Sequence, residues 1–237
     1  LIESEIIEKS ENIEVTLETT SIAITSEKNM KIDSLWESAT KKNPNLFNGK
    51  ALVYTGYNKI GDRINIKVGL THYKYIFASI LHPELNLGLR PLAVSGMVID
   101  NSSNSIIGLR HKNVTQYPEY YELIPSGGIK PDKIKESKTI DFRAQLIEEF
   151  EQEIGLKRKC IDSITSLGLI FEPYYRVYVI ACIIRLNTVL SPDTLKLNEN
   201  EYSSFKIISL KDLEANILRK DIHFVPTSKL ILNNYDS

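Results

Sequence analysis

The sequence predicts an α/β protein in which strands and helices alternate along 237 residues. Segments with apolar residues at every second position are interleaved with segments whose apolar residues recur every three to four positions, which indicates strands and helices respectively. Hydrophobic side chains make up 42% of the chain, enough to bury a full core. We expect two units that pack together, an α+β extension at residues 1–88 and a main domain at residues 89–237.

The extension is predicted to begin with an acidic segment and a strand. β-branched residues recur at alternate positions over residues 15–25, as in a half-buried strand. A helix follows over residues 31–42, beginning near Asp33 or Ser34. It must end before Pro44, because proline disfavours a helical conformation at the residue that precedes it.

Two strands and a second helix complete the predicted extension. The strands cover residues 50–57 and 64–70, and the turn between them contains glycine and aspartate. Thr71 is placed to cap a helix over residues 72–81, because its hydroxyl can accept a hydrogen bond from a free backbone N–H.

The main domain is predicted to open with a hairpin. Residues 92–100 and 106–111 both read as strands, and the turn "NSSNS" joins them. A helix over residues 144–156 follows. The remaining elements are three strands and a closing helix, at residues 163–173, 174–186, 202–210 and 226–234.

Charge and cysteine content restrict the partners. The net charge is −1, from 29 basic and 30 acidic residues. The chain therefore lacks the net positive charge that would attract nucleic acid or an anionic membrane. No apolar run approaches the roughly 20 residues that a membrane span needs. Cys160 and Cys182 are the only cysteines, and Cys182 lies in an apolar run typical of a buried thiol. We expect a cytoplasmic protein that has a small-molecule partner and no disulfide.

The helix over residues 144–156 carries four glutamates within six positions, shortly after a Pro-Ser-Gly-Gly turn. Residues four apart stack on one helix face, so Glu149 and Glu153 project together with Gln152 beside them, while Glu151 points to solvent. Clustered carboxylates suit a hard divalent cation, and paired glycines allow a ligand to approach the backbone closely. We expect an exposed cluster whose replacement changes stability little. The alternative is that these carboxylates only solvate the helix surface.

The stretch "EEFEQEIGL" resembles the second half of the Nudix box, the signature of the Nudix hydrolases. Glu148 stands where that box has arginine, Gln152 replaces a glutamate, and Gly128 lies 21 residues before Glu149, six more than in the standard spacing. Glu149 and Glu153 match the positions that hold magnesium in the family. The resemblance therefore implies a Mg²⁺ site, with Mn²⁺ as a substitute, formed by Glu149, Glu153 and the carbonyl of Gly128.

A narrower resemblance covers roughly residues 35–235. The motifs "NPNLFNG", "GLTHYKYIFAS", "YPEYYELIPSGG" and "PTSKLILNNY" follow one another as in the animal UDP-glucose pyrophosphatases of the Nudix family. This implies a Nudix α/β/α sandwich, a mixed sheet between helices, with the extension covering the nucleotide. It also implies Mg²⁺-dependent hydrolysis of UDP-glucose or UDP-galactose to UMP and a sugar 1-phosphate. The alternatives are hydrolysis of ADP-ribose or another nucleoside diphosphate derivative, and a catalytically silent nucleotide-binding module.

The same resemblance assigns the substrate contacts, which are Phe47, Tyr73, Arg110, Thr115, Glu122 and Ser228. Aromatic rings can stack on uracil, a guanidinium suits a diphosphate, and a carboxylate accepts from sugar hydroxyls.

Several of these residues also have simpler interpretations. Phe47 could be a core aromatic residue, Arg110 a strand-end charge, and Ser228 a cap of the last helix. Glu201 precedes a late strand, where many Nudix proteins bring a further glutamate to the catalytic site, and it could equally lie in a solvated loop.

Overall fold

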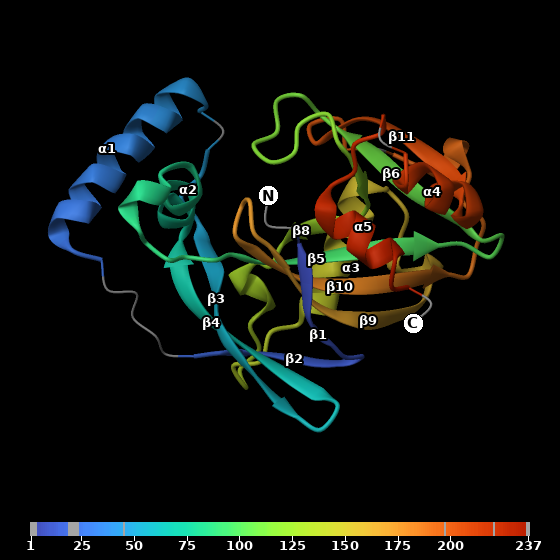
Figure 1. The fold of residues 1–237 in the computed structure, drawn as a ribbon, viewed down its shortest axis with the longest axis horizontal. Coiled ribbons are helices and arrows are strands. Elements are labelled where there is room, and N and C mark those ends of the chain that lie inside the picture. Colours follow the sequence, from blue (N-terminus) through green and yellow to red (C-terminus); the bar gives the residue numbers. More distant parts are fainter. Residues whose placement is uncertain (1–3, 19–23, 45, 197, 220, 236–237) are drawn as a thin grey trace.

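The computed structural model describes residues 4–18, 24–44, 46–196, 198–219 and 221–235 (Figure 1). The strands are β1 (Glu5–Lys9), β2 (Asn12–Leu17), β3 (Lys50–Ile60), β4 (Arg63–His72), β5 (Leu92–Ile99), β6 (Asn104–Arg110), β7 (Tyr121–Leu123), β8 (Ser126–Gly128), β9 (Ile161–Glu172), β10 (Val177–Leu186) and β11 (Tyr202–Ser209). The α-helices are α1 (Ser26–Lys42), α2 (Tyr73–Leu81), α3 (Phe142–Glu153), α4 (Leu210–Ile217) and α5 (Pro226–Leu232).

A mixed five-stranded sheet in the order β1-β9-β10-β5-β8 forms the centre of the molecule, and a three-stranded sheet in the order β11-β6-β7 lies beside it. β10 pairs parallel with β5 and antiparallel with β9. α3 packs into the hydrophobic cluster on one face, and α4 and α5 pack into the cluster on the other (Figure 1). The predicted α/β/α sandwich is confirmed.

Burial on both faces explains the sequence of β10. Nine of its ten residues are buried, because α3 and the extension cover one side while α5 covers the other. Strands covered on both faces read as continuous apolar runs rather than alternating ones. Leu146 and Phe150, four apart on α3, are both fully buried against this sheet. Gly155 follows the helix with φ +81°, a left-handed conformation that glycine adopts without strain.

The extension forms a three-stranded sheet, β2-β4-β3, with α1 and α2 next to it. Ile64, Ile66 and Val68 of β4 are fully buried and belong to the same hydrophobic cluster as α3. β1 pairs antiparallel with β9, so the first strand of the chain belongs to the central sheet. A domain boundary near residue 88 stays a prediction. β1 precedes that boundary in sequence but pairs with a strand of the main domain.

The predicted hairpin of residues 92–111 is wrong. The Asp100 carboxylate accepts hydrogen bonds from the backbone N–H groups of Ser102 and Asn104, both at 2.8 Å, and forms the expected tight turn. The strands on either side of this turn then separate, because β5 enters the five-stranded sheet and β6 the three-stranded one. Both strands bury apolar residues. The apolar pattern of a strand predicts which face is buried, but not which strand it pairs with.

Three local predictions in the extension also need correction. α1 begins at Ser26, not near Asp33, and the Thr25 side chain accepts from the Lys28 N–H at its start. Thr71 lies inside β4, and His72 is the N-cap of α2 without a side-chain cap bond. The strand predicted over residues 15–25 is β2, which ends at Leu17, and residues 19–23 of that prediction lie outside the described residues.

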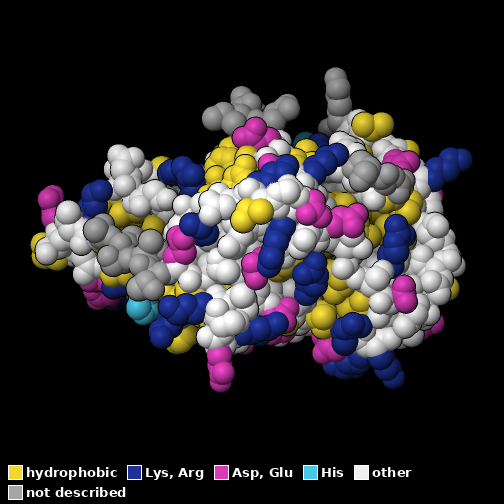
Figure 2. All heavy atoms as spheres, turned by 90° about the horizontal axis from the view of Figure 1, so that it is seen from below, with side chains coloured by type: hydrophobic (Ala, Val, Ile, Leu, Met, Phe, Trp, Pro, Cys, Tyr) yellow, Lys and Arg dark blue, Asp and Glu magenta, His cyan; other side chains and the backbone are white. Residues whose placement is uncertain are grey.

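The surface agrees with the small net charge. Figure 2 shows one face on which Lys and Arg side chains are interspersed with Asp and Glu, without a large area of one sign. Among the described residues, none of the helices combines the length and apolar composition that a bilayer crossing requires.

Candidate active site

Helix α3 carries Glu149 and Glu153 on one face, as its spacing predicts. The Asp141 side chain starts the helix by accepting a hydrogen bond from the Ala144 N–H at 3.0 Å. The two glutamates are 8% and 0% exposed. The expectation of an exposed cluster is therefore wrong, and so is the alternative that these two carboxylates only solvate the helix surface.

Glu149 is held between a side-chain amide, a lysine and a glycine. Gln145 Nε2 donates to Glu149 Oε1 at 2.6 Å, and Lys130 Nζ lies 3.8 Å from the same oxygen. A Cβ atom at Gly127 would lie 2.5 Å from the Glu149 carboxyl carbon, so a larger residue there would displace the Glu149 carboxyl group. Burial raises the pKa of Glu149, and the charge of Lys130 opposes that rise.

Glu153 is a fully buried carboxyl group that lacks part of its hydrogen bonding. Oε2 accepts from the Ser126 N–H at 3.2 Å and lies 3.4 Å from the Tyr202 hydroxyl. Oε1 is buried without a hydrogen-bond partner in the described part of the chain. Burial, and then the charges of Glu122, Glu201 and Glu149, raise the pKa of Glu153 well above its ordinary value. A proton or a cation would relieve this arrangement.

Glu122 and Arg110 form a buried ion pair next to Glu153. Arg110 Nη1 donates to Glu122 Oε2, and Arg110 Nε donates to the Gln116 carbonyl at 2.9 Å. The Tyr202 hydroxyl lies 3.2 Å from Glu122 Oε2. The Tyr202 hydroxyl therefore lies within hydrogen-bond distance of two carboxylates, those of Glu122 and Glu153. The strand-end interpretation of Arg110 does not account for this pairing.

Glu201 approaches the same group of carboxylates. Asn198 Nδ2 donates to Glu201 Oε1 at 3.1 Å, and the charge of Glu201 raises the pKa of both Glu149 and Glu153. Within the described ranges, however, no three His, Cys, Asp or Glu side chains converge in the geometry of a metal site. Glu149 and Glu153 thus offer two carboxylates rather than a complete cage.

The other polar residues of α3 point elsewhere. Gln152 is exposed and donates to Glu148 Oε1 at 3.2 Å. Hydrogen bonds from Lys130 and Lys133, each at 2.6 Å, lower the pKa of Glu148 to about 2. Glu151 accepts from the Arg158 N–H at 2.8 Å, with its side chain 33% exposed. The two departures from the Nudix box at Glu148 and Gln152 therefore lie outside the buried pair.

The aromatic residues of the extension lie at its surface. Phe47 is 81% exposed, which excludes a core role. Tyr73 begins α2, is 36% exposed, and contacts Trp36 edge-on with ring centroids 5.9 Å apart. The structure therefore places Tyr73 on another aromatic ring and leaves Phe47 open to a ligand.

The remaining predicted residues are Ser228, Thr115 and Gly128. Ser228 is fully buried, and its Oγ accepts from the Leu123 N–H at 2.9 Å, so it holds β7 in place and does not cap α5. Thr115 is exposed, and its carbonyl accepts from the Tyr175 hydroxyl at 3.3 Å. Gly128 pairs with Ala93 and has open space beside its Cα.

Three residues of the site were not predicted, namely Gln145, Gly127 and Tyr202. Gln145 precedes Glu149 by four residues, a spacing that could have indicated their contact. Gly127 is the first glycine of the pair already noted. Tyr202 has no sequence signal for its role, because strand pairing brings it to α3. Gly108 makes room for it, since a Cβ there would lie 2.5 Å from the Tyr202 ring.

No protein-family model matches the chain, and no curated protein matches its sequence. Solved structures do resemble it. DR0079 from Deinococcus radiodurans is 14% identical over 62% of this chain and 83% of its own, with a TM-score of 0.47. The MutT protein from Methanosarcina mazei Go1 is 16% identical over 62% and 93%, with a TM-score of 0.43.

A third solved structure is the NUDIX domain of Shewanella oneidensis NrtR in complex with ADP ribose. It is 9% identical over 62% of this chain and 86% of its own, with a TM-score of 0.47. The chain is thus similar, over 62% of its length, to solved structures that include a Nudix domain.

Proposed function

We propose that the chain is a Nudix-type hydrolase that cleaves the diphosphate of a nucleotide sugar, UDP-glucose or UDP-galactose, to UMP and a sugar 1-phosphate. The observation that carries this proposal is Glu153, a buried carboxyl group with an unpartnered oxygen among three further carboxylates. Such a cluster is destabilising unless it takes up a proton or a cation, and a divalent cation is what a diphosphate needs for neutralisation. The resemblance to the Nudix box supports the same residues.

The donor set fits Mg²⁺. Glu149 and Glu153 would hold the ion, with the Gly128 carbonyl as a third ligand. This metal is usually bound by one or two carboxylates plus water and substrate phosphates, and Glu149 and Glu153 are two such carboxylates. When bound, Mg²⁺ neutralises phosphate charge and lowers the pKa of a bound water, and Mn²⁺ can replace it.

The chain's own residues orient the substrate and move the proton. Arg110 is fixed by Gln116 and Glu122, and we assign its remaining nitrogen, Nη2, to a phosphate oxygen. Glu201, held by Asn198, would take the proton of the attacking water on its second carboxylate oxygen. Gln145 fixes Glu149 in the orientation that the site requires.

The extension would bind the nucleobase. Phe47 is exposed and Tyr73 is partly exposed, so both can stack on uracil. In this proposal residues 1–88 cover the nucleotide and residues 89–237 perform the chemistry, with Thr115 and Glu122 near the substrate and Ser228 in a supporting role.

A second candidate is a nucleotide-binding module without catalysis. It is favoured by the absence of a complete set of three acidic ligands among the described side chains, and by Gln152 in place of a glutamate.

The two candidates are distinguished by phosphatase-coupled phosphate release. UDP-glucose, UDP-galactose and ADP-ribose are each incubated with the protein and Mg²⁺, Mn²⁺ or EDTA. We expect metal-dependent release that is fastest with the UDP-sugars. Faster release with ADP-ribose would make ADP-ribose the assigned substrate. Nucleotide binding without any turnover would show that the chain is a nucleotide-binding module without catalysis.

A further inference from the structure

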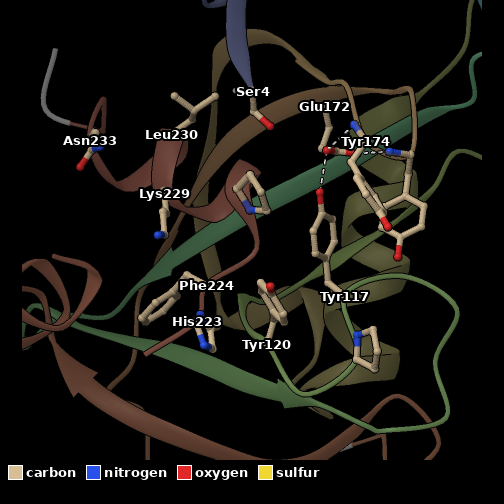
Figure 3. A pocket seen from close by; sticks show the side chains of 13 residues that line it. Ser4, Tyr117, Tyr120, Glu172, Tyr174, His223, Phe224, Lys229, Leu230 and Asn233 are labelled. Atoms are coloured by element: carbon tan, nitrogen blue, oxygen red, sulfur yellow. Dashed lines mark hydrogen bonds between the residues drawn. The ribbon is translucent and has the colours of Figure 1, made fainter. Parts of the chain in front are cut away.

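A cavity of about 910 Å³ lies between the loop after β6, the turn between β9 and β10, and the start of α5 (Figure 3). Aromatic rings from all three segments line it: Tyr117, Tyr120, Tyr174, Tyr175, His223 and Phe224. Its volume is that of a site for a drug-sized ligand. The functional assignments made so far leave this cavity unused.

Glu172 holds the aromatic lining together. This carboxylate is 4% exposed and accepts from the Tyr117 hydroxyl at 2.6 Å, the Tyr174 N–H at 2.9 Å and the Tyr175 N–H at 2.8 Å (Figure 3). Three hydrogen bonds to one buried carboxylate fix the loop after β6 against the turn between β9 and β10. The pocket is therefore built by a dedicated polar contact.

Both loops contain backbone in the left-handed region at residues other than glycine. Tyr117, Glu119 and Arg176 have φ of 47°, 63° and 58°. Such positions cost free energy and concentrate at binding and catalytic sites, where surrounding contacts keep them in place. Tyr117 itself lines the pocket, and Glu119 and Arg176 are each next in sequence to a residue that does.

Polar groups face the aromatic rings from the other segments. Ser4 Oγ is buried without a hydrogen-bond partner among the described residues, and Ser4 lines the cavity. Lys229 on α5 and Asn233, which directly follows that helix, line the opposite side (Figure 3). These groups supply a hydroxyl, an amide and an ammonium, which together can donate to and accept from a ligand rich in hydroxyls.

We propose that this pocket binds the sugar ring of the nucleotide sugar, an inference that rests on the proposed function. A hexose presents C–H groups that pack on tyrosine faces and hydroxyls that bond to polar groups at the edge of the ring. The pocket lies next to Arg110, the assigned diphosphate contact, because the Arg110 N–H donates to the Tyr120 carbonyl at 2.9 Å and Tyr120 lines the pocket.

The rings that line the pocket meet one another at an angle. Tyr117–Tyr175 and Tyr174–Tyr175 meet edge to face, at 80° and 79°, with centroids 5.0 Å and 4.8 Å apart. Tyr120 and His223 are already in contact, with centroids 5.3 Å apart. The rings therefore offer single faces and edges, on which the C–H groups of a sugar can pack.

The test measures product binding by calorimetry in the presence of Mg²⁺, with glucose 1-phosphate and UMP as separate probes. Tyr174 is 70% exposed, so its replacement should leave the fold intact. We expect Tyr174→Ala to weaken glucose 1-phosphate binding about 2- to 10-fold, as for loss of one aromatic contact, and to leave UMP binding unchanged. Tyr174→Phe should retain the affinity. Leu218→Ala, at a residue 80% exposed and outside the pocket, is the control.

Each other outcome overturns the inference. Loss of UMP affinity in Tyr174→Ala would make the pocket a nucleobase site. Unchanged affinity for both products, or no binding of glucose 1-phosphate by the wild-type protein, would show that this pocket does not bind the sugar. Because calorimetry needs no turnover, failure of the proposed function would appear separately, as an absence of hydrolysis of any nucleotide sugar.

Discussion

Replacing Glu153 by glutamine should stabilise the metal-free protein and abolish its activity. In the folded chain this carboxyl group is fully buried, one of its oxygens lacks a partner, and its pKa is raised well above the ordinary value. Glutamine has nearly the same shape and carries no charge. The variant therefore removes the electrostatic penalty without leaving a cavity.

The size of the effect follows from proton linkage. A carboxyl group whose pKa is raised on folding stabilises the protein below its unfolded pKa, about 4.3, and this stability is lost as the pH rises through the folded pKa. Each pH unit in this window is worth about 1.4 kcal/mol, so the gain of the variant grows with pH and is on the order of a few kcal/mol at most at pH 7. For a chain of this length each kcal/mol corresponds to roughly 2–4 °C in Tm.

The assay is thermal unfolding of the wild-type protein and Glu153→Gln in EDTA between pH 4 and pH 8. We expect similar Tm values at pH 4 and an increasing advantage of the variant toward pH 8. Addition of Mg²⁺ should raise the Tm of the wild-type protein and not that of the variant. A variant that is less stable than the wild-type protein at pH 7, or a Tm difference that is constant with pH, would refute the reasoning.

Four further predictions concern activity and stability. Glu149→Gln should lower turnover at least 100-fold, on the order expected for loss of a metal ligand, while Glu151→Gln keeps near-normal turnover; the reverse result would place the metal on another helix face. Tyr73→Ala should raise KM for UDP-glucose about 5- to 100-fold at constant kcat. An unchanged KM would show that Tyr73 does not contact the nucleobase. Gly127→Ala should lower activity with little loss of secondary structure by circular dichroism, because its Cβ would displace the Glu149 carboxyl group; full activity would argue against that contact. The ion pairs of Glu148 should contribute stability that is complete above about pH 4.3 and is lost gradually as the pH falls to about 2, so urea unfolding of Glu148→Gln should differ most from wild type above about pH 4.3 and converge with it near pH 2.

The sequence by itself determined the longer strands of the main domain, the helices α3 and α5, and the placement of Glu149 and Glu153 on one helix face, but not β7, β8 or α4. These features depend on local spacing: residues four apart share a helix face, and an apolar run such as β10 must be buried on both sides. Glycine has no Cβ, so the glycine pair by itself predicts that another group can come close to the backbone there.

Only the tertiary structure decided how these elements are used. The strands β5 and β6 enter different sheets, because alternation specifies a buried face and not a partner. Glu153 is buried because β11 brings Tyr202 over α3, and neither residue carries a local signal for that contact. The aromatic pocket joins three loops that are distant in sequence, and its single carboxylate, Glu172, has no neighbouring motif. Burial and long-range contacts depend on the packing of whole elements, which residue spacing does not encode.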